Sequence, residues 1–418
     1  MILTSQYSLI MFPAASLLTT LLLALSIAAS PVEVRNSPVT LPIARRLNTS
    51  GGTINLLQHD QSRAAALKSF KGDSTLSRRT GSITVTNDAV GYIAEVGVGS
   101  PATNYYLIVD TGSSNTWVGA DTKYVKTSTS VDTGDAVEVT YGSGSFSGTE
   151  YTDTVTLGSG LTITAQSIGV AATSTGFTGV DGIIGIGPLI LTEGTLTNYP
   201  DTTIPTVTDN LYSQGIISEI VVGISFEPTT TESDANGELT FGGVDATKYT
   251  GTLAYTPLTT TAPASYYWGI NESITYGTTT ILAETAGIVD TGTTLILLAS
   301  NAYAEYKSAT GATLDATTGL LRITTTQYSA LKALNFVVGS NTYTLTANAQ
   351  IWPRSLNAYI GGTTSYIYLV VNDLGTPSGE GLDFINGYTF LERFYSVFDT
   401  THSQVGFATT AYTDATTN

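Results

Sequence analysis

The 418-residue sequence contains no cysteine, two histidines and three tryptophans. The lack of cysteine excludes disulfides, thiol catalysis, iron–sulfur clusters and thiolate zinc sites. Past residue 80 the sole histidine is His402, in a turn that we expect to be solvated, and the chain has no Gly-x-Ser-x-Gly motif. A Ser-His-Asp hydrolase is therefore disfavoured. This poverty of ligands predicts a protein that uses no metal and no cofactor.

Charged residues make up only 12% of the chain and are unevenly distributed. Residues 1–79 carry a net charge of +5, whereas residues 80–418 carry −22. The acidic body, residues 80–418, is expected to repel nucleic acids and anionic membranes. The basic stretch contains Arg45-Arg46 and ends in the dibasic pair Arg78-Arg79, which is typical of a processing point. We interpret residues 30–79 as a cationic pro-segment docked on the acidic body; the alternative is a floppy N-terminal arm.

One long apolar run, FPAASLLTTLLLALSIAAS at 12–30, ends in small residues. It predicts a signal peptide over residues 1–29, and hence a secreted, extracellular protein that has no membrane contact after processing. An uncleaved membrane anchor is the alternative interpretation. The polar C-terminal sequence TTAYTDATTN offers no lipid-anchor tail.

Abundant Thr, Val, Ile and Tyr predict a mainly β protein. Residues 89–120 have the pattern of two strands joined by a Gly-Ser-Pro turn, and residues 136–158 that of a long hairpin with its tip at Gly142–Gly144. The turn formers of EPTTTESDANGE, residues 227–238, predict a linker or loop.

The triad Asp-Thr-Gly occurs three times, beginning at Asp110, Asp132 and Asp290. The first and third copies follow apolar runs, LIV and GIV, and precede a hydroxyl residue. Each is followed by a similar apolar-Gly segment, DGIIGIG after the first and FINGYTF after the third, which indicates two similar halves. Asp132 follows the polar KTSTSV and is interpreted as part of a surface turn.

Two such turns brought together would place two carboxylates face to face. Like charges about 3 Å apart cannot both ionise, so the pair shares a proton. One carboxylate then acts as a base on water, and the protonated one donates to a carbonyl oxygen. This arrangement is suited to amide hydrolysis without a covalent intermediate.

The segments VDTGSSNTW, VTYGSGS, DGIIGIG, LTFGGVD, IVDTGTTL and YSVFDTTHSQVGFA occur in this order from residue 109 to 408. In sequence and spacing they resemble the pepsin family of aspartic endopeptidases, and in particular its cysteine-free secreted fungal members. The resemblance implies a bilobal pepsin-like fold of two similar β lobes, over 80–236 and 237–418, with an active-site cleft between them. It further implies a monomer that cleaves proteins or peptides and binds pepstatin-type inhibitors.

The resemblance also implies roles for individual residues. The catalytic dyad would be Asp110 and Asp290, with Ser113 and Thr293 on their outer oxygens. The supporting loops would comprise Thr111, Gly112, Thr291 and Gly292, the two threonines reaching across to the opposite lobe. Flap and substrate contacts would come from Tyr141 (its hydroxyl near Trp117), Gly142, Ser143, Ile183, Gly292 and Thr294.

The chain departs from the family pattern at two positions. Many members read Gly-Asp where this chain has Gly387-Tyr388, a position expected to support the cleft floor and specificity. Fungal relatives that accept Lys before the cut carry Asp where this chain has Ser143. We therefore expect a hydrophobic residue before the scissile bond, because an entering Lys would lack a carboxylate partner.

Other functions remain to be weighed. A glycosidase also uses two carboxylates, but it needs no matched Asp-Thr-Gly turns and usually has more tryptophan. YGSGS lacks the Lys-Ser/Thr of a phosphate loop. The alternative from another class is a catalytically silent pepsin-like protein that only binds or inhibits a partner. Such relatives usually lose an Asp or its hydroxyl neighbour, and this chain keeps both.

Two further expectations concern processing. Asn271-Glu272-Ser273 is a glycosylation sequon in the body, and Asn48-Thr49-Ser50 is another that would leave with the pro-segment. In the precursor, a lysine such as Lys68 or Lys71 is expected to reach the dyad and silence it. Acid would then release the pro-segment, with cleavage near Arg79.

Overall fold

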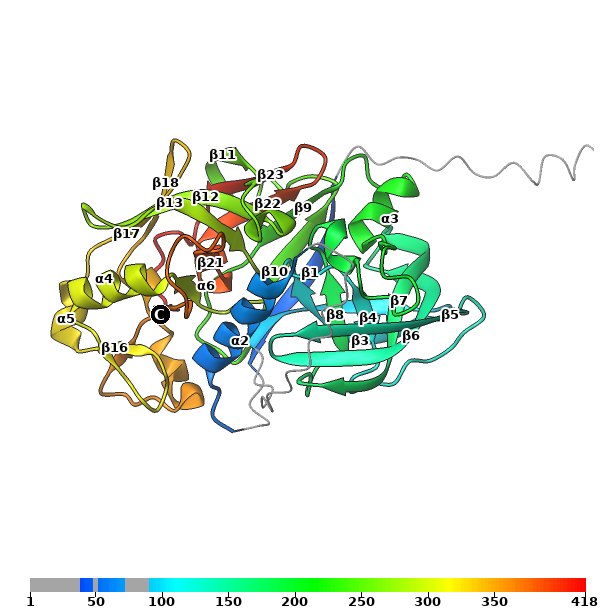
Figure 1. Cartoon of the computed structure of the whole chain (residues 1–418), viewed down its shortest axis with the longest axis horizontal. Helices are drawn as coiled ribbons and strands as arrows, with labels where there is room; N and C mark the ends of the chain where they lie inside the picture. The colour runs from blue at the N-terminus through cyan, green and yellow to red at the C-terminus, as the bar shows by residue number, and fades with distance from the viewer. Residues whose placement is uncertain (1–37, 48–51, 72–89) are drawn as a thin grey trace, which may run out of the picture. The chain divides into compact units, whose positions relative to one another are not determined.

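A 13-stranded sheet takes strands from the beginning, middle and end of the chain. The computed structural model describes residues 38–47, 52–71 and 90–418 (Figure 1). The sheet order is β11 (Thr250–Pro257), β23 (Gln404–Thr409), β22 (Phe394–Asp399), β9 (Val221–Ser225), β10 (Ser233–Phe241), β1 (Val39–Leu47), β2 (Val90–Val98), β3 (Thr103–Asp110), β8 (Gly182–Gly185), β4 (Thr116–Val118), β7 (Thr162–Thr175), β6 (Gly144–Thr156) and β5 (Val131–Tyr141).

Two smaller sheets belong to the C-terminal half. The seven-stranded sheet runs β18 (Asn341–Leu345), β17 (Leu334–Val338), β12 (Gly269–Tyr276), β13 (Thr279–Val289), β21 (Phe384–Asn386), β14 (Ile296–Leu298) and β20 (Val371–Asp373). The three-stranded sheet runs β15 (Thr313–Leu314), β16 (Leu321–Ile323) and β19 (Ile367–Tyr368). The fold is mostly β and two-lobed, as the sequence predicted.

The helices of the described residues are short, and the longest has 14 residues. The α-helices are α2 (Leu56–Ser69), α3 (Val207–Ser213), α4 (Ser300–Thr310), α5 (Thr325–Ser329) and α6 (Tyr388–Leu391), and the 3-10 helices are η1 (Leu189–Thr192), η2 (Ala264–Tyr266), η3 (Asn348–Gln350) and η4 (Arg354–Ile360). Within the described ranges, no helix has both the length and the apolar character needed to span a bilayer.

The two halves repeat one three-strand unit. In the first, β3 pairs in parallel with β8, and β8 pairs antiparallel with β4. In the second, β13 pairs in parallel with β21, and β21 pairs antiparallel with β14. Asp110 ends β3 opposite Gly185, and Asp290 follows directly after β13, whose Val289 lies opposite Asn386. The internal repeat seen in the sequence is thus a structural repeat that presents one Asp per unit.

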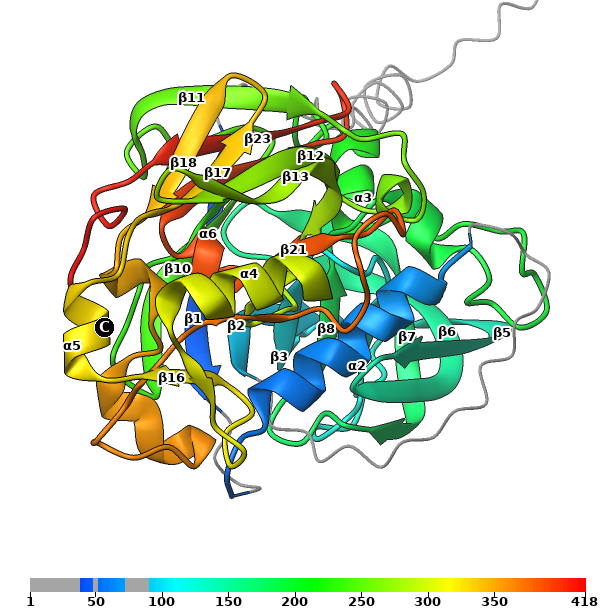
Figure 2. The same cartoon turned by 60° about the vertical axis from the view of Figure 1, so that its left-hand side comes forward.

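The basic N-terminal segment contributes two elements to this fold. β1 lies between β10 and β2 and pairs antiparallel with both, joining strands from the two halves of the chain. Helix α2 follows β1 in the sequence (Figure 1), and in the view of Figure 2 it lies in front of β2 and β3. In the ranges described, 38–47 and 52–71, the segment forms a strand and a helix, so the alternative of a floppy arm is wrong.

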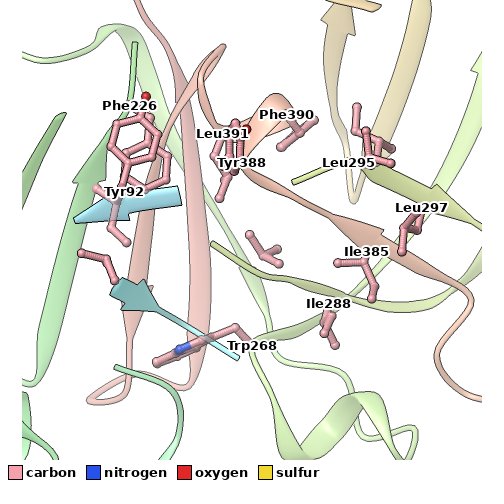
Figure 3. Packing of buried hydrophobic residues seen from close by; sticks show 14 of the residues in the cluster. Tyr92, Phe226, Trp268, Ile288, Leu295, Leu297, Ile385, Tyr388, Phe390 and Leu391 are labelled. Atoms are coloured by element: carbon pink, nitrogen blue, oxygen red, sulfur yellow. The ribbon is translucent and has the colours of Figure 1, made fainter. Parts of the chain in front are cut away.

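Apolar side chains alternate inward along the paired strands and form the core. Tyr92 stacks on Phe226 at 3.6 Å between ring centroids, and Tyr388 meets Tyr92 edge-on at 6.0 Å (Figure 3). Ile288 of β13 and Ile385 of β21 lie opposite each other and are fully buried. This packing fixes the strand ends from which the two Asp-Thr-Gly loops emerge.

Two local predictions are wrong. The stretch 227–238 is a loop only as far as residue 232, because β10 begins at Ser233 and pairs with β9 and β1. The predicted lobe boundary at 236/237 therefore falls inside a strand. Asp132 is exposed as expected, but it lies in β5, where the register shifts between Asp132 and Ala136 around Gly134, whose φ is 79°. It forms a bulge rather than a turn.

Candidate active site

Asp110 and Asp290 lie at equivalent strand ends with equivalent partners. Ser113 Oγ donates to Asp110 Oδ2 at 2.5 Å, and Thr293 Oγ1 donates to Asp290 Oδ2 at 2.5 Å. The N–H groups of Gly112 and Gly292 donate to the Oδ1 atoms of the same carboxylates at 2.9 and 3.1 Å. Each carboxylate is therefore held by one hydroxyl and one backbone amide of its own loop.

Thr111 and Thr291 lock the two loops together. Each threonine hydroxyl accepts from the N–H group of the other threonine at 2.9 Å. Thr111 Oγ1 donates to the carbonyl of Val289 at 3.2 Å, and Thr291 Oγ1 donates to that of Val109 at 2.9 Å. All four bonds are buried, so they hold the carboxylates in register across the two halves.

Arg63 of α2 lies between the two carboxylates. Its Nη2 atom donates to Asp110 Oδ1 at 2.5 Å and to Asp290 Oδ1 at 2.8 Å, and its Nε donates to Asp290 Oδ2 at 2.6 Å. The Cβ atom that a side chain would add at Gly112 or Gly292 would lie within 2.5 Å of the guanidinium, so only glycine leaves room for it. The expectation that Lys68 or Lys71 reaches the dyad is wrong.

The two lysines contact other groups. Lys68 Nζ hydrogen-bonds Thr376 and lies 3.3 Å from Glu380, while Lys71 is exposed. The helical period explains the difference. The buried positions of α2 are Leu56, Asp60, Arg63, Ala64 and Leu67. These positions recur at helical spacing. The helical period of the apolar residues also places Arg63 on the buried face, and this was the sequence signal that would have identified it.

The electrostatics of the pair are asymmetric. Burial raises the pKa of Asp110, and the negative charge of Asp290 adds to this, so the attraction of Arg63 does not bring it back to its ordinary value. Burial also acts to raise the pKa of Asp290, but there the charge and hydrogen bonds of Arg63 outweigh it and the pKa is lowered. The guanidinium of Arg63 thus stabilises the ionised form of Asp290. Asp110 is the carboxyl group of the pair that binds a proton more readily.

Asp60 makes a second contact between α2 and the C-terminal half. Its carboxylate accepts from the N–H of Thr294 at 3.1 Å and from that of Leu295 at 2.7 Å, and it is fully buried. His59 Nδ1 lies 3.0 Å from the other carboxylate oxygen. The backbone N–H of Thr294, a residue predicted to contact substrate, is therefore bound to a side chain of the helix.

The hairpin β5–β6 contributes Tyr141, the last residue of β5, to the site. Trp117 Nε1 donates to the Tyr141 hydroxyl at 2.9 Å, the contact expected from the sequence. Trp117 is fully buried and stacks on Phe146 at 4.3 Å. At the hairpin tip a Cβ on Gly142 would lie 2.1 Å from the carbonyl oxygen of Ser62, so α2 lies directly against the tip.

A cavity remains beside the dyad and the helix. Its lining combines helix, hairpin and sheet residues, namely His59, Arg63, Gly91, Ile108, Asp110, Tyr141, Ser143, Phe177, Ile183, Thr291 and Gly292. Of the predicted substrate contacts, Tyr141, Ser143, Ile183 and Gly292 line it. The lining combines apolar side chains such as Phe177 and Ile183 with polar and charged ones such as Arg63 and Asp110.

Tyr388 contacts the C-terminal Asp-Thr-Gly loop, because its N–H donates to the carbonyl of Thr293 at 2.8 Å, and its expected effect on specificity stays a prediction. Tyr388 is fully buried and lies against Arg45 of β1, whose Nη2 approaches its hydroxyl at 3.4 Å, and it is not among the residues that line the cavity. Arg45, known from the sequence only as half of a dibasic pair, is 1% exposed, and its Nε lies 3.5 Å from Oε1 of Glu392. Alternation along β1 was the available signal, because Leu41, Ile43, Arg45 and Leu47 share the buried face.

A two-lobed β fold that aims two carboxylates at one point, each oriented by a hydroxyl and an amide, defines a hydrolase of the aspartic type. A family profile described as "Eukaryotic aspartyl protease" matches residues 91–410. The chain belongs to this family and is an aspartic endopeptidase.

Named relatives agree with this assignment. The chain is 66% identical to polyporopepsin of Irpex lacteus over 339 residues, which are 81% of this chain and 99% of the relative. It is 31% identical to rhizopuspepsin-1 of Rhizopus niveus over 396 residues, 90% of this chain and 94% of the relative. The crystal structure of the aspartic proteinase from Irpex lacteus matches with a TM-score of 0.79 and 58% identity, covering 91% of this chain and 100% of that one.

Proposed function

We propose that this protein is a secreted acid endopeptidase, made as a zymogen, that hydrolyses peptide bonds between preferentially hydrophobic residues. The observation that carries the proposal is the symmetric pair of Asp110 and Asp290, closed by Arg63 at 2.5 to 2.8 Å. A cation seated between the two carboxylates suits an enzyme that must be silent until its N-terminal segment leaves.

The reaction follows from the environments of the two carboxylates. With Arg63 gone, the pair shares one proton, because both groups are buried and repel each other's charge. The ionised carboxylate takes a proton from a water molecule as it attacks the scissile carbonyl, and the protonated one donates to the carbonyl oxygen. Proton transfer to the leaving amine then breaks the C–N bond.

Two side chains of α2 and the strand β1 would hold the precursor closed. Arg63 neutralises the dyad, Asp60 occupies the amides of Thr294 and Leu295, and β1 completes the sheet between β10 and β2. Arg63 stays charged at every working pH, so acid must act on the carboxylates. As pH falls toward about 4, Asp110, whose pKa is raised, and the acidic side chains of the body take up protons, and their hold on the basic segment weakens. Cleavage near Arg79 would complete the conversion.

Specificity would come from the cavity walls. Tyr141, Phe177 and Ile183 offer apolar surface, and no carboxylate stands at Ser143 to pair with a lysine. We therefore expect peptides with Leu or Phe before the cut to be cleaved faster than those with Lys. We also expect inhibition by pepstatin, and a monomer that carries glycan on Asn271, which is exposed on β12.

The test is acid conversion of the full precursor purified at neutral pH. The parent should shorten to the mature form below about pH 4 and then hydrolyse denatured protein, and pepstatin should block both steps. The Asp290→Asn precursor should stay intact in the same buffer. A parent that stays inactive in acid, and is still inactive after a dibasic-specific protease has cut it, would favour the silent binding protein instead.

A further inference from the structure

Glu272 is a buried carboxyl group behind the C-terminal dyad strand. It lies on β12 opposite Thr285 of β13, and its exposed fraction is 0%. Asn386, which ends β21 and is also 0% exposed, donates from Nδ2 to Glu272 Oε2 at 3.0 Å. The reaction described above makes no use of this pair.

The hydrogen bonds of the pair are incomplete in a specific way. Glu272 Oε1 and Asn386 Oδ1 are both buried without a partner among the residues that the structure describes. Both atoms are acceptors when Glu272 is ionised, so neither can satisfy the other. A proton on Oε1 would donate to Oδ1 and complete a reciprocal pair of hydrogen bonds between acid and amide.

The charges around Glu272 do not offset its burial. Burial raises its pKa to about 8, and the bond from Asn386 opposes this only in part. The neighbouring strands β17 and β21 carry no titratable residue; β13 carries only Glu284, which is exposed, and η2 carries Tyr266. No ion pair of Glu272 occurs in the described part of the chain.

Two further carboxyl groups flank these strands. Asp383, just before β21, accepts from Thr285 Oγ1 at 2.5 Å and from the amides of Gly379 and Glu380. Asp290, just after β13, is bound to Arg63. Both are acidic, so neither favours an ionised Glu272.

Asn386 links this pair to the dyad. Its backbone carbonyl accepts from the N–H of Asp290 at 3.1 Å, while its side chain holds Glu272. We propose that Glu272 is protonated, that it forms a reciprocal acid–amide pair with Asn386, and that this pair positions Asp290. Glu272 is thus a positioning residue, and the inference rests on the proposed role of Asp290 for its catalytic consequence only.

The protonation is tested by infrared spectroscopy on the full chain at pH 6, where exposed carboxyl groups are ionised. The parent should show a protonated carboxylic acid band that Glu272→Gln removes. The exposed Glu284→Gln is the matched control and should leave it. Glu150, whose pKa burial raises to about 7, contributes a second band that Glu150→Gln identifies. An unchanged spectrum for Glu272→Gln would overturn the proposal, whatever the activity of the enzyme.

The positioning role is tested after acid conversion. Glutamine can donate to Asn386 Oδ1 and accept from Nδ2, so Glu272→Gln should keep kcat within about twofold in acid. Glu272→Leu should lower kcat about tenfold and leave KM nearly unchanged, because the reacting geometry is displaced while the cavity is intact. Equal kcat for Leu and Gln would contradict positioning.

A pH series of melting temperatures covers the case in which the Leu variant does not fold. Because the folded pKa is above the unfolded value near 4.3, the contribution of Glu272 is fully present below that value and is lost as pH rises through about 8. Glu272→Gln should therefore lose less stability than the parent between pH 5 and 8. An equal loss would contradict the protonated pair.

Discussion

The Nε atom of Arg63 lies 2.6 Å from Oδ2 of Asp290, and its Nη2 atom bonds both aspartates. A planar guanidinium matches this fork, whereas an ammonium does not. A charge-assisted hydrogen bond contributes about 1.5–3 kcal/mol, so losing this set should open the precursor by roughly tenfold or more.

We therefore predict that Arg63→Gln hydrolyses a small peptide at least about tenfold faster than the parent precursor in the first seconds at pH 5, before conversion is visible on a gel. Arg63→Lys should lie between them. Lys71→Gln removes the same charge from an exposed position and serves as the control. Equal early rates for Arg63→Gln and Lys71→Gln would mean that overall charge, and not the dyad contact, silences the enzyme.

A second prediction concerns the choice among the three triads. Asp110→Asn and Asp290→Asn should each abolish proteolysis with the fold intact, because in the proposed reaction the two carboxylates share one proton and both are required. The double variant should be scarcely worse than either single one. Asp132→Asn should be fully active, since Asp132 is exposed and its carboxylate accepts a hydrogen bond from the Tyr151 hydroxyl. Assays of converted enzyme, with circular dichroism as the fold control, decide it.

The dyad was predictable from sequence because its signal is local and doubled: an apolar strand, a tight glycine turn and a hydroxyl, twice. The fold class followed from the same repeat. The periods of α2 and β1 place Arg63 and Arg45 on buried faces, but the group that each one binds was not predictable, because its carboxylate partner lies 47 or 347 positions away in the sequence. The surroundings of the Tyr388 side chain were not predictable for a related reason, since its neighbour Arg45 lies in β1, 343 positions away in the sequence.

A third prediction tests the link between the two halves. Thr111→Val or Thr291→Val keeps the shape but leaves a buried N–H and a buried carbonyl without a partner. Each unsatisfied group costs about 1–3 kcal/mol. Urea unfolding of the full chain should show a clearly lower midpoint for each variant, and a double variant less destabilised than the sum, because the four bonds share partners. Thr162→Val, at an exposed position, should unfold like the parent.

A fourth prediction concerns Arg45 of β1 and Glu392, which directly follows α6. Arg45 Nη1 donates to the Thr229 carbonyl at 3.0 Å, and its guanidinium lies 5.7 Å from the ring of Trp352. Burial raises the pKa of Glu392, and the charges of Arg45 and Arg393 only partly offset this. Removing Arg45 leaves the buried carboxylate with only the smaller contribution of Arg393, and breaking a buried ion pair costs about 3–5 kcal/mol.

Arg45→Met should therefore destabilise the precursor strongly at pH 7 and much less at pH 4. The sign follows from the raised pKa: Glu392 is neutral in the fold at low pH, and stability is lost as pH rises past the unfolded value near 4.3. Adding Glu392→Gln should restore much of the loss at pH 7, because no charge is then buried alone. Arg46→Met is the control. Arg46 lies in the same strand as Arg45, and its guanidinium is 4.5 Å from the ring of Tyr106. If thermal unfolding shows Arg45→Met and Arg46→Met to be alike at both pH values, Arg45 contributes packing alone, and Glu392 finds its compensation elsewhere.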